Sequence, residues 1–364
     1  MTAATVRTLL VADTHLGFDL PFHPRVLRRR RGYDFFANFQ TALLPALRSE
    51  VDLVVHGGDL LFRSRVPPAL VEMALAPLIR VAEGGVPVFL VPGNHERSRI
   101  PLQLPAPLLS GAEWAGHPNL YIFDRPRTFV CRVAGVSLAL SGFPFAREVR
   151  DRFVHLVDQT RHDKTAADAH LLCVHQTVEG AQVGPSDYTF RGGPDVIRGR
   201  DIPAGFAAVL AGHIHRAQVL THDLWGRPLA APVVYPGSVE RTAFAERNED
   251  KGYALVRLDL SAGEPGARIE STFVSLPARP MVVLSLEPES RNRESLVARL
   301  RERLSALDPD AVVRIELCGP HAASTRDVLT AAYLRELAPP TMNVELTPDW
   351  ISPRPPAPRV PAHG

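Results

Sequence analysis

The sequence predicts a large α/β domain with two sheets, followed by a smaller α/β unit. Near-continuously apolar runs alternate with amphipathic segments over roughly the first ninety residues, in the β-α-β-α-β order of a parallel sheet. Shorter apolar runs, several of them spaced like antiparallel strands, follow in the middle of the chain. A second alternation of strands and helices begins after Pro277 and Pro280, which mark a boundary.

The first part of the chain contains three predicted strands joined by two helices. The strand segments are apolar almost throughout, as in strands that are buried on both faces. One helix carries Phe and Leu at helical spacing, and the other opens at Pro67 and Pro68, where a missing N–H costs little. Parallel strands with right-handed crossovers are therefore expected. The predicted strands are 6–12, 51–55 and 86–91, and the predicted helices are 33–48 and 68–82.

The middle of the chain adds more strands and one helix to the large domain. Ala134-Gly135 is a plausible hairpin turn between two of the strands. Residues 176–205 are polar and rich in Gly and Pro, and we expect a long loop with a functional or mobile role. The predicted helix is 147–160, and the predicted strands are 119–123, 127–133, 136–141, 169–175, 206–211, 217–221, 229–234, 252–260 and 268–276.

The smaller unit is expected to follow the boundary, so that the large domain covers residues 1–278 and the small one residues 279–346. Its predicted strands are 281–287, 311–318 and 342–346, and its predicted amphipathic helices are 291–306 and 325–337. The segment 347–364 is rich in proline, and we expect it to be disordered or extended.

The composition is that of a globular protein of the reducing cytoplasm. The chain has 364 residues with 45% hydrophobic content, and no stretch approaches the roughly 18–20 uncharged apolar residues of a membrane span. We expect no N-terminal signal, because a strand begins almost at once. Cys131, Cys173 and Cys318 are far apart and form no CxxC, which argues against a disulfide framework and a thiolate metal site. The net charge of +2 indicates no particular partner.

Chemically versatile side chains directly follow five of the predicted strands. Functional residues of parallel sheets gather in the crevice at the carboxyl ends of the strands, so we expect these side chains to lie together. They are Asp13 and His15 after the first strand, Asp59 after the second, Asn94 and His95 after the third, and then His175, His213 and His215.

The spacing within these groups predicts which side chains share a face. Residues i and i+2 of a strand point the same way, so Asp13 is expected to aim with His15, and the two histidines of Gly212-His-Ile-His215 together. Adjacent residues diverge, so only one member of the pair Asn94 and His95 is expected to bind a given metal ion. The other is free to face a substrate.

The donor set predicts two metal ions. Carboxylate, amide and imidazole groups without thiolates suit Mn²⁺, Fe²⁺ or Zn²⁺ in a catalytic site better than a structural zinc site. Seven ligands are too many for one open ion, but they fit two ions that Asp59 bridges at about 3.5–4 Å. Such ions hold a hydroxide nucleophile and neutralise a phosphoryl group, and His95 can then protonate the leaving oxygen or stabilise the transition state. The predicted ligands are Asp13, His15, Asp59, Asn94, His175, His213 and His215.

As a set, these motifs resemble those of the calcineurin-like metallophosphoesterases. The match rests on Asp13-Thr-His15, Gly57-Gly-Asp59, Gly93-Asn-His-Glu96, the histidine of Val174-His-Gln176, and Gly212-His-Ile-His215. A narrower resemblance is to SbcD-type nucleases of double-strand-break repair. It rests on Tyr235 to Arg241, on Phe244, Glu246 and Lys251-Gly-Tyr253, on Gly142 to Phe145, and on the small unit, which is similar to that family's capping domain.

The resemblance implies a four-layer αββα sandwich, two manganese ions, and exonuclease or endonuclease action on DNA. Carried over position by position, one ion would be held by Asp13, His15, Asp59 and His215. The other would be held by Asp59, Asn94, His175 and His213, with His95 as the catalytic histidine. The family also implies a homodimer and an SbcC-type ATPase partner.

Two departures from the family pattern stand out. Many members have a second histidine three residues after the bridging aspartate, where this chain has Phe62. Slower cleavage or a substitute substrate-binding donor such as Arg63 is therefore expected. The family's helical segment for docking the ATPase is not evident after the small unit, so this association is open.

Three functions are compatible with the sequence. The first is a DNA nuclease, with Arg28 to Arg31, residues 176–205 and the small unit shaping a DNA channel and with strongly salt-dependent binding. The second is a phosphodiesterase acting on nucleotides or other small phosphoesters, with the small unit as a lid. The third is a non-catalytic scaffold, which is disfavoured because no ligand is missing.

Overall fold

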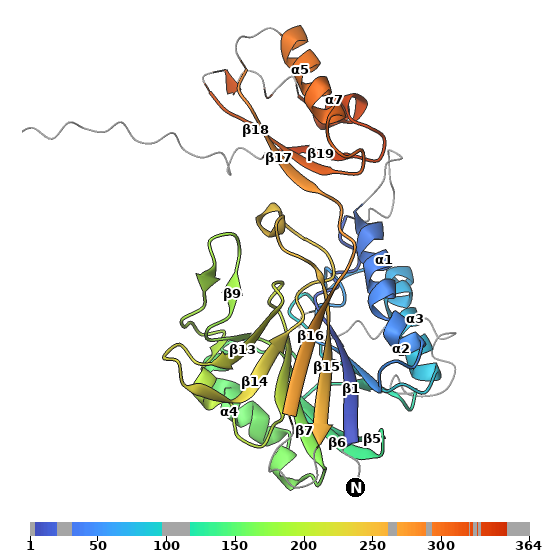
Figure 1. The fold of residues 1–364 in the computed structure, drawn as a ribbon, viewed down its shortest axis with the longest axis vertical. Helices are drawn as coiled ribbons and strands as arrows, with labels where there is room; N and C mark the ends of the chain where they lie inside the picture. Colours follow the sequence, from blue (N-terminus) through green and yellow to red (C-terminus); the bar gives the residue numbers. More distant parts are fainter. Residues whose placement is uncertain are drawn as a thin grey trace, which may run out of the picture. The chain divides into compact units, whose positions relative to one another are not determined.

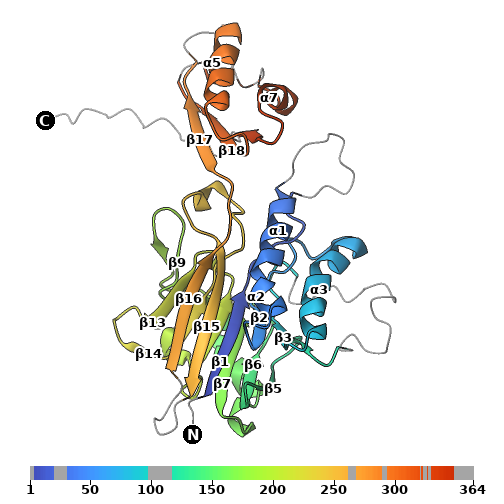
Figure 2. The same cartoon turned by 45° about the vertical axis from the view of Figure 1, so that its right-hand side comes forward.

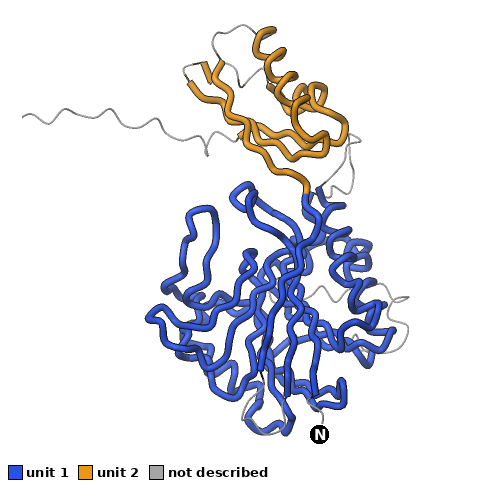
Figure 3. The backbone as a smooth tube through the Cα atoms, viewed as in Figure 1, with its two compact units in different colours: residues 1–20, 31–278 blue, residues 21–30, 279–364 orange. Residues whose placement is uncertain are grey.

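The computed structural model describes residues 4–19, 31–96, 117–260, 268–288, 293–319, 321–322, 326 and 329–347. The chain forms two compact units (Figure 3), and the boundary between them lies after Ala278. Residues 348–364 of the predicted tail and Arg28 to Arg30 lie outside the described residues.

The first sheet of the large unit has six strands, in the order β16-β15-β1-β2-β3-β4. Its strands β16, β15 and β1 lie side by side in Figure 1. Strands β1 to β4 are parallel, while β15 pairs antiparallel with both β1 and β16. The strands are β1 Ala4–Val11, β2 Leu53–His56, β3 Val88–Leu90, β4 Leu120–Ile122, β15 Gly252–Leu260 and β16 Arg268–Ser275.

The second sheet also has six strands, in the order β13-β14-β12-β7-β6-β5. Its four central strands are parallel, and an antiparallel strand flanks them at each edge. At one edge, Ala134 and Gly135 have φ values of 50° and 79° and form the predicted hairpin turn. The strands are β5 Arg127–Val133, β6 Val136–Gly142, β7 Ala169–His175, β12 Ala208–Gly212, β13 Gln218–His222 and β14 Pro228–Tyr235.

The large unit has four layers, with helices on the outer face of each of the two packed sheets (Figure 2). Successive side chains along a strand therefore point alternately into the core between the sheets and into the core beneath the helices. In β1, Leu10 packs between the two sheets, while Leu9 packs against α1 (Gly32–Ala42) and α3 (Pro68–Glu83). In β7, Cys173 lies between the sheets and Leu172 packs with α4 (Val149–Gln159). This period-two burial confirms the predicted αββα sandwich.

Two segments differ from the sequence-based prediction. The helix expected over 33–48 is broken, because Pro45 lacks an N–H and its ring clashes with the preceding turn; α2 (Leu44–Leu47) therefore restarts beside it. The expected loop at 176–205 contains two small ladders. They pair β8 (Thr177–Val178) with β11 (Val196–Ile197), and β9 (Gln182–Val183) with β10 (Tyr188–Thr189).

The small unit is a three-stranded parallel sheet with its own core. The strands β17 (Met281–Leu286), β18 (Val312–Leu317) and β19 (Asn343–Leu346) pack with α5 (Arg293–Ser305) and α7 (Ala331–Leu337). The Thr330 hydroxyl caps α7 by accepting a hydrogen bond from the Tyr333 N–H. Among the described residues of both units, no helix is long and apolar enough to cross a membrane.

Candidate metal centre

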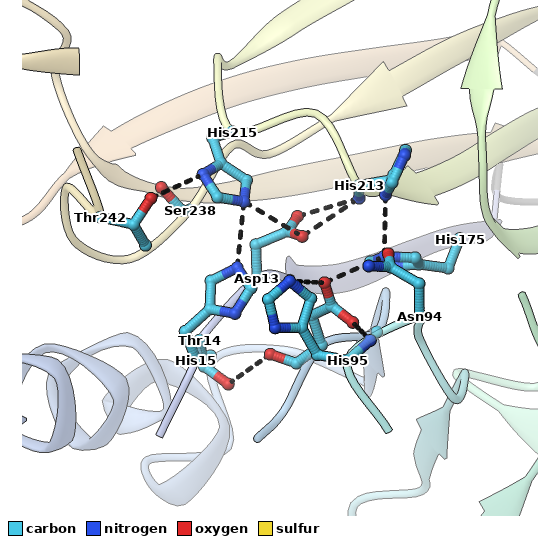
Figure 4. Close-up of polar contacts among 12 residues, drawn as sticks. Asp13, Thr14, His15, Asn94, His95, His175, His213, His215, Ser238 and Thr242 are labelled. Carbon is cyan, nitrogen blue, oxygen red and sulfur yellow. Dashed lines mark hydrogen bonds and ion pairs between the residues drawn. The ribbon is translucent and has the colours of Figure 1, made fainter. Parts of the chain in front are cut away.

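The candidate site lies where strands of both sheets end (Figure 4). Three of the contributing loops follow β1, β2 and β3 of the first sheet and one follows β12 of the second, while His175 is the last residue of β7. The strands are parallel within each sheet at these positions, so their carboxyl ends meet. All eight predicted strand-end residues come together there: Asp13, His15, Asp59, Asn94, His95, His175, His213 and His215.

Loop geometry, rather than the pleat of a strand, aims these side chains. The loops after β1 and β2 run together, with Asp13 N–H donating to Gly58 O and His15 N–H to Asp59 O, both at 2.9 Å. Asp13, His15, Asp59 and His213 all have positive φ, between 44° and 87°. Non-glycine residues are strained there, and such strain clusters at functional sites. The argument from i, i+2 alternation was therefore wrong in its premise, although Asp13 and His15 do converge.

The first group of potential metal ligands is Asp13, His15 and His215, whose ligand atoms lie within 4.8 Å of one another. The Nε2 atoms of His15 and His215 are 3.0 Å apart, and His215 Nε2 lies 3.8 Å from the Asp13 carboxylate. The Asp13 carboxylate also accepts the His213 N–H at 3.0 Å, which ties the two sheets together.

The second group is Asp59, His175 and His213. His175 Nε2 lies 3.4 Å from Asp59 Oδ2, 3.3 Å from His213 Nδ1 and 3.0 Å from the Asn94 side-chain oxygen. The other nitrogen of His175 faces the Gly57 carbonyl at 2.8 Å and donates its proton there. Nε2 is therefore directed at the Asp59 carboxylate and Asn94, and it offers a lone pair to a metal ion once its proton is lost. The two histidines of the Gly-His-Ile-His motif thus serve different groups, which corrects the expectation that they aim together.

Asp59 and His15 belong to a third group with His95. The His95 N–H donates to Asp59 Oδ1 at 2.9 Å, and its Nε2 lies 3.8 Å from Asp59 Oδ2. Its Nδ1 donates to the Phe62 carbonyl at 2.7 Å, which leaves Nε2 directed into the site. The side chain is 34% exposed, so it is accessible from outside. Asn94 lies against His175, whereas His95 lies with Asp59 and His15.

The spacing of the ligand atoms fits divalent ions. Two imidazole nitrogens bound at about 2.1 Å and at right angles to one ion lie about 3.0 Å apart. His15 and His215 have this separation, and that between His175 and His213 is 3.3 Å. Oxygen and nitrogen donors in this mixture suit Mn²⁺, Fe²⁺ or Zn²⁺.

The electrostatics of the centre also favour cations. Burial opposes charge on His175, but the Asp59 carboxylate outweighs it and raises the pKa of His175 to about 9. Burial lowers the pKa of His213 to about 3, with a smaller effect from His175, so His213 is neutral and available as a ligand. The position beside Asp59 therefore favours a positive charge, which a proton or a divalent cation supplies.

These pKa values predict that metal affinity rises with pH. His175 is protonated below about pH 9, and a bound ion must displace that proton, so affinity should increase up to that pH. For one displaced proton the gain is about tenfold per pH unit. Calorimetric titration of Mn²⁺ at pH 7.0 and 8.0, in buffers of matched ionic strength, measures this change in affinity. Equal affinity at the two pH values would contradict this arrangement.

Two carboxylates support the centre, buried Glu96 and partly buried Glu246, and sequence reasoning did not assign them this role. Glu246 Oε1 accepts from His215 Nδ1 at 3.1 Å and so turns its Nε2 toward the first group. Glu96 accepts the N–H of Leu61 at 2.6 Å and of Gly93 at 2.8 Å, which joins the loops after β2 and β3. Glu96 is 2% exposed, so it is a buried link between these loops and not an exposed turn charge.

Phe62 and Arg63 border the centre. The Phe62 ring lies 5.6 Å from the His95 ring and 5.9 Å from the His15 ring, between centroids. The Arg63 guanidinium lies over the Phe62 ring at 5.6 Å, and Arg63 is exposed. It is not part of any of the three ligand groups.

Arg31 does not line a DNA channel as proposed for the run Arg28 to Arg31. It is only 9% exposed and stacks over the rings of Phe18 and Phe35, 3.9 Å from the Glu240 carboxylate. Its guanidinium also donates to the Arg241 carbonyl. Tertiary packing thus gives this residue a structural role, which a run of four arginines cannot reveal.

Gly212, at the end of β12, and Gly57, after β2, lie against each other where the two sheets approach beneath the ligands. A Cβ on Gly212 would lie 2.2 Å from the carbonyl oxygen of Gly57. That neighbour is backbone and cannot turn aside. The close approach of the two sheets beneath the ligands therefore requires a residue without a side chain at this point.

Gly212→Ala is accordingly expected to lower the free energy of unfolding by about 1–3 kcal/mol, as overpacking does in other cores. It should also weaken metal binding, because the loops after β2 and β12 carry Asp59 and His213. Urea denaturation and Mn²⁺ titration measure the two effects. Gly192→Ala is the control, since its nearest heavy atom would be the Arg150 Nη1 at 3.9 Å and little change is expected. Equal stability of both variants would contradict the packing argument.

Comparison with known proteins agrees with these observations. The calcineurin-like phosphoesterase family matches residues 6–217, more than half of the chain. DNA double-strand break repair protein Mre11 of Haloferax volcanii is 28% identical over 323 residues, covering 86% of this chain and 61% of that protein. The Mre11 of Methanosarcina mazei is 26% identical over 328 residues, covering 86% and 45%.

A further relative is the uncharacterized metallophosphoesterase YhaO of Bacillus subtilis, 26% identical over 257 residues, covering 68% of this chain and 56% of that protein. The chain thus spans about half to three-fifths of the length of these curated relatives. The match over residues 6–217 contains every strand-end motif described above and confirms the resemblance. The chain belongs to the calcineurin-like phosphoesterase family.

Proposed function

We propose that this protein is a two-metal phosphodiesterase that cleaves DNA by hydroxide attack on backbone phosphodiesters. The observation that carries the proposal is the pair of ligand groups at the strand ends, with Asp59 close to both and His95 beside them. The similarity to proteins named for DNA double-strand break repair supports DNA as the substrate.

In this proposal Asp13, His15, Asp59 and His215 hold one ion. Asp59, Asn94, His175 and His213 hold the other, and both are Mn²⁺. The ions would supply a hydroxide nucleophile at neutral pH and neutralise charge on the phosphoryl group. The protein residues fix this geometry through the Gly57 carbonyl and the Glu246 carboxylate, which orient one histidine of each group.

His95 is proposed to act on the leaving group. Its Nδ1 proton is held by the Phe62 carbonyl at 2.7 Å, so Nε2 is the atom that faces a substrate. When protonated, Nε2 donates to the leaving oxygen and stabilises the charge that develops as the P–O bond breaks. Arg63, exposed over the Phe62 ring, is proposed to contact a substrate phosphate in place of the family's second histidine.

The apolar side chains of helices α1 to α3 provide an argument about the predicted homodimer. Phe35 and Phe39 are fully buried in the core, while Tyr33 is 61%, Leu47 44% and Met73 49% exposed. Their inner faces therefore belong to the core, and the outer apolar side chains support the predicted homodimer. Association with an SbcC-type ATPase stays a prediction from the resemblance.

The test is degradation of an end-labelled DNA duplex by the Mn²⁺-loaded protein at low salt. We expect cleavage that EDTA abolishes, and much slower turnover of a cyclic nucleotide in a parallel assay. Rapid turnover of the cyclic nucleotide with intact DNA would favour a small phosphoester substrate, with Phe62 as the first residue to exchange. A metal-loaded protein that cleaves neither would contradict the enzymatic proposal.

A further inference from the structure

A fully buried lysine lies directly behind one of the candidate metal ligands. Lys251 is 1% exposed, and its Nζ makes three polar contacts, each at 2.9 Å. They join it to the main-chain oxygen of His215, to Glu246 Oε2 and to Glu249 Oε2. An ammonium group has three donors, so these contacts use its full capacity.

His215 is held from two directions as a result. Glu246 faces its ring at Nδ1, and the Lys251 ammonium fixes the opposite oxygen of that carboxylate. The main-chain oxygen of His215 accepts from both Lys251 Nζ and the Ser238 N–H, the latter at 3.1 Å. Figure 4 shows His215 with Ser238 and Thr242 on one side and His15 and Asp13 on the other. Ring and backbone are therefore fixed with Nε2 directed at the first ligand group.

The segment around Gly237 passes close to the main chain of His215. Gly237 has a φ of 77°, and a Cβ there would lie 2.8 Å from the main-chain oxygen of His215. Only glycine adopts this conformation readily and leaves room for the contact. Gly237, Ser238 and Lys251, which lie in the segments that supported a resemblance in the sequence, thus all approach the main-chain oxygen of His215.

A buried charge of this kind is costly to maintain. Removing an ammonium and two carboxylates from water costs several kcal/mol per ion, and apolar residues of similar size often stabilise a fold better. A positioning role explains why the charge is kept, since it holds the Glu246–His215 pair in one geometry. We propose that Lys251 is a positioning residue that fixes His215 for the ion of the Asp13–His15–His215 group, an inference that rests on the proposed two-metal function.

The experiment measures Mn²⁺ affinity by calorimetry with Lys251→Met placed in two backgrounds. His213→Ala removes a ligand of the second group, so that Mn²⁺ binding reports on the first group. His15→Ala removes a ligand of the first group, so that binding reports on the second. In the His213→Ala background, Lys251→Met should weaken the remaining site about 10–100-fold, the usual effect of losing an outer-shell partner. In the His15→Ala background, it should change affinity by less than about threefold.

A matched control separates this selective effect from a general loss of stability. Arg150 forms an ion pair with buried Glu179 at 2.9 Å and also donates to the Val196 carbonyl, away from all ligands. Arg150→Met should lower thermal stability without changing affinity in either background. Equal weakening of both sites by Lys251→Met, or no weakening of either, would overturn the inference.

Two further outcomes are distinguishable. If Lys251→Met does not fold, Glu249→Gln removes the negative charge of one partner of the ammonium and leaves the lysine charge in place. That variant should weaken the first site by at least about threefold and leave the second unchanged, and equal affinities would overturn the inference. If the wild type binds no Mn²⁺ at all, the two-metal proposal itself fails, and this inference fails with it.

Discussion

Asp59→Asn should, on the proposed two-metal function, abolish most of the phosphodiesterase activity and reduce the Mn²⁺ bound per chain from two to one or none. The Asp59 carboxylate is 2% exposed and lies near His175, His15 and His95, and an amide in its place carries no negative charge to hold an ion. We expect kcat/KM to fall by about 10³-fold, because metal-ion stabilisation of the transition state contributes several kcal/mol. Elemental analysis of the dialysed variant, combined with the duplex assay, measures both effects.

Asp52→Asn is the control for this substitution. Asp52 is also a carboxylate at the first sheet, but it pairs with Arg7 at 3.0 Å, away from the ligand groups. Its replacement should leave metal content and activity unchanged. An Asp59→Asn protein that still holds two ions would show that this carboxylate does not bridge them.

His95→Ala should lower kcat by about 10²–10⁴-fold, the usual contribution of a general acid, while two ions stay bound. His95 lies close enough to Asp59 and His15 to be an alternative metal ligand, so metal content decides between the two roles. The pairing of its Nδ1 with the Phe62 carbonyl directs Nε2 into the centre and fits either role, so the measured metal content makes the assignment.

The control for this variant is His155→Ala, since His155 is exposed on α4 and bonds only to Gln159 in the described contacts. Full activity is expected from it. Loss of one ion together with activity in His95→Ala would make His95 a ligand and would leave the leaving group without an assigned acid.

The candidate ligands could be predicted because each directly follows an apolar run. That pattern is local in the sequence, and the parallel arrangement of β1, β2, β3, β7 and β12 brings the run ends together. The four layers followed from the family resemblance and are visible in the alternating burial of Leu9 and Leu10.

The supporting residues could not be predicted, because their contacts are distant in sequence. Glu246 and Lys251 reach His215 across 31 and 36 residues, and no periodicity marks either of them. The left-handed conformations of Asp13 and His213 likewise come from tertiary hydrogen bonds. The ladders within 176–205 consist of strands of two residues, too short to give an alternating pattern.

The most direct test of the two-metal account is anomalous diffraction from crystals of the protein grown with Mn²⁺. The account predicts two anomalous peaks about 3.5–4 Å apart, with the Asp59 carboxylate between them. One peak should lie against Asp13, His15 and His215, and the other against His175 and His213. A single peak, or a second one away from His175 and His213, would contradict it.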